Sequence, residues 1–333
     1  MRRRTAITVI PALATTVLIG RLPRAFSETA HLYRIGFLSP VNFALGSVSG
    51  NLVTGVVRDL NQLGYALGTN LEIEKRGAEA QVERLPGLVD QLVAAHVAVI
   101  VTNNYPGALA AKHGTSTIPI VLAGGGDPVK TRLVASLARP GGNITGISDV
   151  AAELAPKRLE ILRDAVPGLK RVAMLWNAGD LGMTFRYQAS AAAAMQLNVE
   201  VMPLGVREPD DFEVAFDAMD RHRPDGLLMV ADALTTLNRK RVYEFAAAHH
   251  LAAIYEYDNF ARDGGLMSYG PDREETEERV ASLIDRLLKG ANPANLPLEQ
   301  PTRFRLAINL KTAKALNLTL PLSLLARADE VIE

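Results

Sequence analysis

Cysteine is absent from this 333-residue chain, so no disulfide can hold the fold together. Aromatic residues are also scarce, at 5% of the sequence, whereas apolar residues make up 48%. Burial alone must therefore stabilise roughly 300 residues, which a chain of this size can achieve. The length predicts about two domains, and the abundance of alanine, leucine and valine suits helices packed on sheets.

A run of uncharged residues long enough to cross a bilayer is also missing from the N-terminal region. The run Ala6–Gly20 has 15 residues, and a spanning helix needs about 20. Arg2–Arg4 precede this run, and the small residues Ala25 and Ser27 follow it. A basic segment, a short apolar segment and a small-x-small site are typical of a secretory signal. We therefore expect a signal peptide at residues 1–27 and a mature protein in the periplasm.

Two alternatives for this segment remain open at the level of sequence. The apolar run could be a permanent membrane anchor, although it is short for that purpose. The arginines leave both the general secretory and the twin-arginine route open. A lipid anchor is excluded because no cysteine follows the run.

The chain has no net charge, with 36 basic and 36 acidic residues. Without the five arginines of the predicted signal, 31 basic residues stand against 36 acidic ones, a net charge of about −5. A protein with this balance has no electrostatic reason to bind nucleic acid or an anionic membrane surface. We therefore expect no nucleic-acid partner.

Apolar runs typical of strands alternate with amphipathic runs typical of helices. This alternation predicts an α/β fold with two doubly wound parallel-sheet lobes. The predicted strands are Tyr33–Leu38, Leu71–Lys75, Val97–Val101, Ile118–Leu122, Ile144–Ile147, Arg171–Leu175, Val199–Met202, Gly226–Val230, Ala252–Tyr255, Leu266–Ser268 and Arg303–Asn309. The predicted helices include Ala108–Lys112, Thr131–Ala138, Leu154–Ala165, Tyr187–Leu197, Phe212–Arg221, Lys240–His250, Glu274–Leu288 and Lys311–Leu316.

The order of these elements predicts where the lobes divide. We place the N-terminal lobe at residues 31–148 and the C-terminal lobe at residues 149–271. The tail is too long to complete only the second lobe, so we expect it to cross between the lobes. A helix at about 272–290 then joins the N-terminal lobe, and residues from about 300 to 333 join the C-terminal lobe.

Polar, acidic and aromatic residues follow the predicted strands, and basic residues are nearly absent there. In parallel α/β sheets, ligands bind beyond the carboxyl ends of the strands. This lining suits a neutral or amine-bearing solute. The strand exits hold Ser39 and Pro40, Thr102–Tyr105, Gly124–Pro128, Trp176 and Asn177, Asp232, and Glu256–Asn259.

Eight of these residues are candidates for ligand binding, and each has a structural alternative. Asp127 before Pro128 could simply cap a helix, glycines supply permissive backbone, and asparagine often ties off loop backbone. Trp176 fits a core position better than a stacking platform. The candidates are Ser39, Asn103, Tyr105, Gly125, Asp127, Asn177, Asp232 and Glu256.

Motifs for catalysis or for a cofactor are missing. None of the six histidines lies in an HExxH motif or at zinc-ligand spacing, and no G-x-S-x-G elbow is present. The glycines at Gly124–Gly126 form neither a phosphate-binding loop nor a GxGxxG fingerprint. We therefore expect no catalytic residue, no metal, no cofactor and no enzyme activity.

Several long blocks of this sequence recur together in one known family: Arg34–Ser39, Ser116–Val121, Gly126–Val129, Leu133–Gly146, Lys157–Leu162, Gly264–Gly270, Glu299–Phe304, Ile308–Lys314 and Leu324–Glu333. With these blocks the chain resembles the ABC transporter substrate-binding proteins that are often described as tryptophan/tyrosine-uptake components. The resemblance covers nearly all of the mature chain. One departure falls at the cleft, where Asn103–Gly107 replaces the Gly/Thr-Pro-Ala-Ala loop of many relatives.

The resemblance implies a type I periplasmic-binding fold, with a multi-strand hinge between two lobes and a ligand in the cleft. It also implies a small-molecule ligand, such as an amino acid, that a monomeric receptor delivers to an ABC permease in the inner membrane. We hypothesise that Asp127 and an acidic residue of the second lobe meet an ammonium group. Loop amides and Ser39 would hold a carboxylate, and Tyr105 would contact the side chain. A sensory ligand-binding protein and, less favoured, a secreted α/β enzyme are the alternatives.

Overall fold

The computed structural model describes residues 31–44 and 47–333, so the predicted signal peptide lies outside the described residues. The first sheet consists of five parallel strands in the order β2-β1-β3-β4-β5. The middle strand, β3, consists only of β-branched residues and is buried throughout, as expected for a strand that is covered on both faces. The strands are β1 (Tyr33–Ser39), β2 (Leu71–Gly77), β3 (Val99–Thr102), β4 (Ile120–Ala123) and β5 (Ile144–Ile147).

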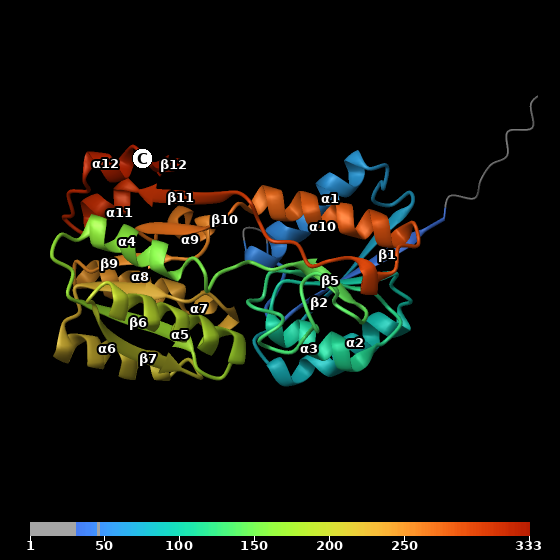
Figure 1. Ribbon diagram of the computed structural model, residues 1–333, viewed down its shortest axis with the longest axis horizontal. Coiled ribbons are helices and arrows are strands. Elements are labelled where there is room, and N and C mark those ends of the chain that lie inside the picture. The colour runs from blue at the N-terminus through green and yellow to red at the C-terminus, as the bar shows by residue number, and fades with distance from the viewer. Residues whose placement is uncertain (1–30, 45–46) are drawn as a thin grey trace, which may run out of the picture. The chain divides into compact units, whose positions relative to one another are not determined.

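Helices cover both faces of this first sheet. One face packs against α1 (Val48–Gln62) and α10 (Arg273–Leu288), which lie side by side (Figure 1). The other face packs against α2 (Leu85–Ala94) and α3 (Tyr105–Gly114). Helix α10 thus comes from the C-terminal part of the sequence but completes the core of the first sheet.

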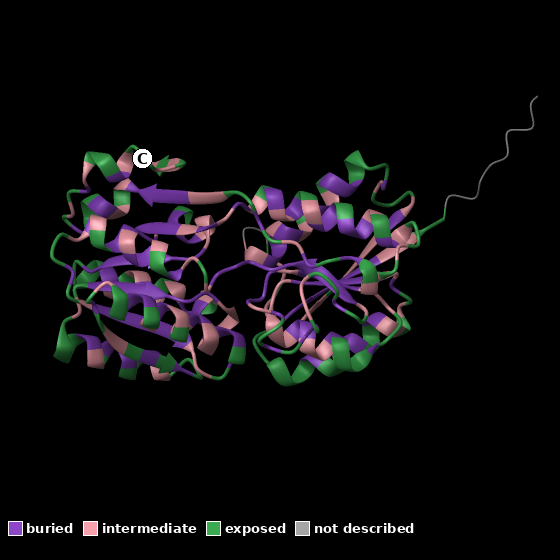
Figure 2. Ribbon diagram, viewed as in Figure 1, coloured by how far each residue is buried: buried purple, intermediate pink, exposed green. Residues whose placement is uncertain are grey.

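The second sheet has seven strands in the order β12-β11-β10-β9-β8-β6-β7. Strand β11 runs antiparallel to β10, and the other neighbouring strands are parallel. Figure 2 shows that the strands of both sheets are largely buried. The strands are β6 (Arg171–Asn177), β7 (Glu200–Val206), β8 (Gly226–Met229), β9 (Ala252–Tyr255), β10 (Met267–Pro271), β11 (Phe304–Asn309) and β12 (Glu330–Ile332).

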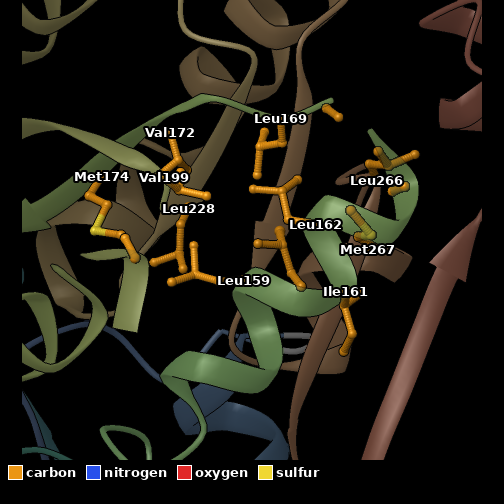
Figure 3. Close-up of a cluster of buried hydrophobic side chains, with 14 of the residues drawn as sticks. Leu159, Ile161, Leu162, Leu169, Val172, Met174, Val199, Leu228, Leu266 and Met267 are labelled. Atoms are coloured by element: carbon orange, nitrogen blue, oxygen red, sulfur yellow. The ribbon is translucent and has the colours of Figure 1, made fainter. Parts of the chain in front are cut away.

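This second sheet is also covered on both faces. Leu159 and Leu162 of α4 pack on Val172 and Leu228 of the sheet, in the apolar cluster drawn in Figure 3. On the opposite face, Phe212 and other residues of α6, α8 and α9 form a separate core. The helices are α4 (Ala155–Ala165), α5 (Leu181–Gln196), α6 (Asp211–His222), α7 (Ala233–Leu237), α8 (Arg239–Ala248), α9 (Asp258–Arg262), α11 (Leu310–Ala315) and α12 (Leu322–Leu325).

The chain passes between the two sheets three times. It leaves the first sheet after β5, returns directly from β10 into α10, and passes back through residues 289–303 into β11. The first and third crossings run in parallel, since Ile147 pairs with Glu299 and Ser148 N donates to the Glu299 carbonyl at 2.9 Å. Three crossing segments therefore join the parts of the chain that carry the two sheets.

Two predicted helices differ from the structure. The segment Thr131–Ala138 is not a helix but a series of turns and bends, in which Arg132 has a left-handed φ of 58° that a continuing helix does not allow. Helix α5 begins at Leu181 rather than at Tyr187, because the Asp180 carboxylate caps the amides of Gly182 and Met183. Among the described residues, no helix has the length and apolar character needed to cross a membrane.

Candidate functional site

A cavity of about 70 Å³ lies where strand exits of both sheets meet the crossing segments. The N-terminal turn of α1 contributes Asn51, and the exit of β3 contributes Asn103. Asp149 comes from the first crossing, and Tyr257 and Asp258 follow β9. Arg273 and Thr276 enter from α10. The position beyond the carboxyl ends of parallel strands is the one where α/β proteins bind ligands.

Asp149 connects the two sides of this cavity. Its Oδ2 accepts hydrogen bonds from the amides of Gly125 (3.1 Å) and Gly126 (3.4 Å) and from the Tyr257 hydroxyl (3.1 Å). The same oxygen pairs with the guanidinium of Arg186 on α5. The amides can point at Asp149 because Gly124–Gly126 all adopt positive φ, which glycine tolerates. Asp149 therefore ties the β4 exit to residues that belong to the second sheet.

A second carboxylate, Glu256, completes a buried ionic cluster with Asp149. Arg186 Nη1 donates to Glu256 at 2.7 Å, and Arg158 Nη1 donates to Glu256 at 3.2 Å. Arg158 also binds the carbonyls of Ala151 and Tyr269, each at 2.8 Å. The four charged side chains are only 2% to 5% exposed. We call Asp149, Glu256, Arg158 and Arg186 the ionic cluster.

Electrostatic interactions keep the Asp149–Arg186 pair of this cluster ionised. Burial on its own would raise the pKa of Asp149, but the charge of Arg186 and the backbone amides hold it below its usual value. Burial opposes the charge of Arg186 as well, yet the carboxylates of Asp149 and Glu256 hold its pKa well above the usual value. Asp149 and Arg186 therefore both stay charged at neutral pH.

The cavity wall also carries two charged groups outside this cluster. Asp258, which is 12% exposed, pairs with Arg262 at 2.9 Å. Arg273 donates from Nη1 to Glu277 at 2.6 Å, whereas its Nε is buried and has no hydrogen-bond partner among the described residues. A guanidinium has five N–H donors, so Arg273 retains capacity for a further acceptor.

The first turn of α5 touches the opposite side of the site. A Cβ added at Gly182 would lie 3.5 Å from the Tyr105 Cβ and 3.7 Å from the Gly125 carbonyl. Asp180, directly before this turn, has its pKa raised to about 6 by burial and by the nearby charge of Asp232. The absence of a side chain at Gly182 therefore permits close packing between α5 and the loops of the first sheet.

Of the eight predicted ligand-binding residues, Asn103 lines the cavity, and the other seven do not, within the described part of the chain. The Ser39 hydroxyl is buried against Ser49 at 2.9 Å, and the Gly125 amide is bonded to Asp149. Glu256 is held by two arginines and by the Ala231 amide.

The remaining candidates stabilise local backbone or pack between loops. The Asp127 carboxylate accepts the amides of Val129 and Lys130, both at 3.0 Å, and so closes a turn in place of the expected helix cap. Asp232 caps α7 and accepts a hydrogen bond from Asn177 at 2.5 Å. Tyr105, at the start of α3, packs near Gly182, as described above.

Sequence reasoning missed Asp149, Arg186 and Arg273. Asp149 lies two residues beyond β5, so the position of ligand sites at strand exits is the sequence signal that points to it. Arg186 gave no local signal, because an arginine in the middle of a helix usually reaches solvent. Among residues 31–44 and 47–333, no group of histidine, aspartate and glutamate could hold a metal ion.

Solved structures with the same fold include solute-binding proteins. A protein from Streptococcus pneumonia, described as an ABC domain in complex with L-Trp, superposes with a TM-score of 0.83 at 24% identity, covering 90% of this chain and 100% of that one. The leucine-binding protein LivK of Thermotoga maritima superposes at 0.59 and 11% identity, covering 78% and 83%. The chain therefore has a type I periplasmic-binding-protein-like fold.

Sequence comparison points in the same direction. A "Tyrosine-binding protein" of Clostridioides difficile (strain R20291) is 25% identical over 264 residues, which cover 79% of this chain and 76% of that protein. The family described as "ABC transporter substrate binding protein" matches residues 46–332, which is most of the chain. The protein thus belongs to the ABC transporter substrate-binding protein family.

Proposed function

We propose that this protein is the receptor of an ABC importer, which captures an amino acid or a related small solute and delivers it to a permease in the inner membrane. It works in the periplasm as a monomer and has no enzyme activity. The observation that carries the proposal is the cavity at the strand exits, whose wall is built from both sheets. Two relatives are described as bound to, or binding, aromatic amino acids.

The charged groups on the cavity wall suggest how such a solute is held. Asp258 would receive the ammonium group, and the guanidinium of Arg273, whose side chain is 33% exposed, would receive the carboxylate. This assignment replaces Asp127, whose carboxylate is engaged in a turn. Asn103 and the Tyr257 hydroxyl supply further polar atoms beside the cavity.

The size of the cavity bears on the side chain of the solute. A volume of about 70 Å³ has room for roughly two water molecules, since each occupies about 30 Å³ in the liquid. Even a compact amino acid such as alanine or serine needs more room than this. An aromatic amino acid would require the walls to move apart, as hinged binding proteins can do.

Titration calorimetry with the twenty amino acids tests the proposal. We expect one solute per chain to bind, and Asp258→Asn to weaken that binding at least tenfold, roughly the loss expected when one partner of a desolvated charge pair is removed. Arg262 keeps Glu330 as a second partner at 2.6 Å, so the substitution leaves no isolated cation.

Asp127→Asn is the matched control, since asparagine can also close the turn that Asp127 caps. It should leave the affinity unchanged. Wild-type affinity in Asp258→Asn, or a large loss in Asp127→Asn, would contradict the assignment of the site. Uptake of the bound solute by cells with and without the gene then tests delivery to a permease.

A further inference from the structure

Each charged side chain that lines the cavity has a partner of opposite charge within the described chain. Asp149 pairs with Arg186, Asp258 with Arg262 and Arg273 with Glu277. No charged group on this wall is therefore left without a counter-charge. The positive and negative charges therefore balance when the lining residues are counted together with their ion-pair partners.

The ionic cluster, which is more deeply buried than the cavity wall, also has equal numbers of positive and negative groups. Its two carboxylates, Asp149 and Glu256, face two guanidinium groups, Arg158 and Arg186. Arg186 is the member that pairs with both carboxylates, and all four side chains are at most 5% exposed. Solvent therefore screens any change in the charge of this cluster only weakly.

We propose that the cavity selects solutes of zero net charge, either zwitterions or uncharged molecules, and that Arg186 is the residue that sets this selectivity. The inference rests on the proposed solute-binding function and specifies its substrate class. A net cation or anion would have to lose its hydration in a cavity that offers no spare counter-charge. A zwitterion can use Asp258 and Arg273 at the same time and leaves the total charge unchanged.

The selectivity can be measured on the wild-type protein with pairs of solutes that match in size. Glutamine and glutamate differ by one negative charge, and norleucine and lysine differ by one positive charge. We expect the neutral member of each pair to bind at least about thirtyfold more tightly. Equal affinities within both pairs, or preference for a charged member, would overturn the proposal.

Variants of the ionic cluster test the role of Arg186 through gains of binding, which misfolding cannot produce. Arg186→Met leaves a net negative charge behind the wall, so lysine should gain at least about tenfold relative to norleucine. Asp149→Asn leaves a net positive charge, so glutamate should gain relative to glutamine. The double variant Arg186→Met with Glu256→Gln restores the balance and should prefer neutral solutes again. Uniform losses with unchanged ratios would contradict the assignment to Arg186.

The outcome separates this inference from the proposed function. The same titrations include glycerol, acetate and ethylamine as solutes that are not amino acids. If only an uncharged solute such as glycerol binds, the charge selectivity stands and the amino-acid assignment fails. If lysine or glutamate binds best, the amino-acid assignment stands and the charge selectivity fails.

Discussion

Replacing Arg186 by methionine should lower the free energy of unfolding by about 3 to 5 kcal/mol at pH 7, the loss expected when a buried ion pair loses one partner. The guanidinium is 4% exposed and lies between carboxylates that are 5% and 2% exposed. Methionine fills a similar volume, so the loss comes from uncompensated charge more than from a cavity. For a folded chain of roughly 300 residues, whose entropy of unfolding is about 0.6 kcal/mol/K, the loss corresponds to a decrease in Tm of about 5 to 8 °C.

The pH dependence of this loss follows from Asp149. In the wild type, the pKa of Asp149 in the folded protein is lowered, so its contribution is present above the unfolded pKa and is lost as pH falls through the folded pKa. In Arg186→Met, burial acts without the guanidinium and raises the folded pKa above the unfolded one. The variant then gains stability as pH falls from 7 towards 4. The difference between its free energy of unfolding and that of the wild type should therefore become smaller.

Urea unfolding at pH 7 and pH 4.5, followed by circular dichroism and by the fluorescence of the single tryptophan, Trp176, measures both effects. Arg327→Met is the control, because the Arg327–Asp164 pair at 2.7 Å is 42% and 41% exposed and should contribute only about 0 to 1 kcal/mol. If Arg186→Met lowers the free energy of unfolding by less than about 1 kcal/mol, or by an amount that does not change with pH, the reasoning is refuted.

Three further substitutions test other parts of the structure. Gly182→Leu should weaken solute binding roughly five- to hundredfold with the fold retained, because the new side chain meets Tyr105. Gly87→Leu is the control, since no atom lies within 4 Å of a Cβ added there, and titration calorimetry should show no loss of affinity. Gly146→Ala should lower the free energy of unfolding by about 3 kcal/mol or more, since the φ of Gly146 is 142° and the new Cβ would clash with the backbone of β4. Differential scanning calorimetry measures this change, and an unchanged Tm would contradict it. Burial and the charge of Asp232 raise the pKa of Asp180 to about 6. The Asp180 carboxylate therefore destabilises the folded state above that pH, and this destabilisation becomes smaller as pH falls towards 4. Asp180→Asn keeps the helix cap and should raise the Tm at pH 7.5 but not at pH 4, so an equal shift at both values would be inconsistent with the raised pKa.

The fold could be predicted from the sequence because its signals are local. A β-branched apolar run such as Val99–Thr102 indicates a buried parallel strand, and strands alternating with amphipathic helices define the layers. Two helix predictions were wrong because the backbone conformation of one residue, or one side-chain cap, determines whether and where the helix forms. Arg132 interrupts the expected helix after Asp127, and Asp180 starts α5 earlier than its apolar pattern indicates.

The candidate site was only partly predictable, because its groups are brought together by tertiary structure. Asn103 and Asp258 both follow predicted strands, and both line the cavity. A position at a strand exit does not show that Glu256 is engaged by arginines from α4 and α5, since those residues lie 98 and 70 positions away in the sequence. The length of the tail predicts that the helix carrying Arg273 returns to the first lobe, but no local pattern indicates that Arg273 itself lines the cavity.

Native mass spectrometry of the protein purified without unfolding tests the central claim most directly. The account predicts one equivalent of a co-purified solute with zero net charge, which is lost in Asp258→Asn and retained in Asp127→Asn. A protein that carries no solute and whose Tm does not respond to any amino acid or small neutral molecule would contradict it.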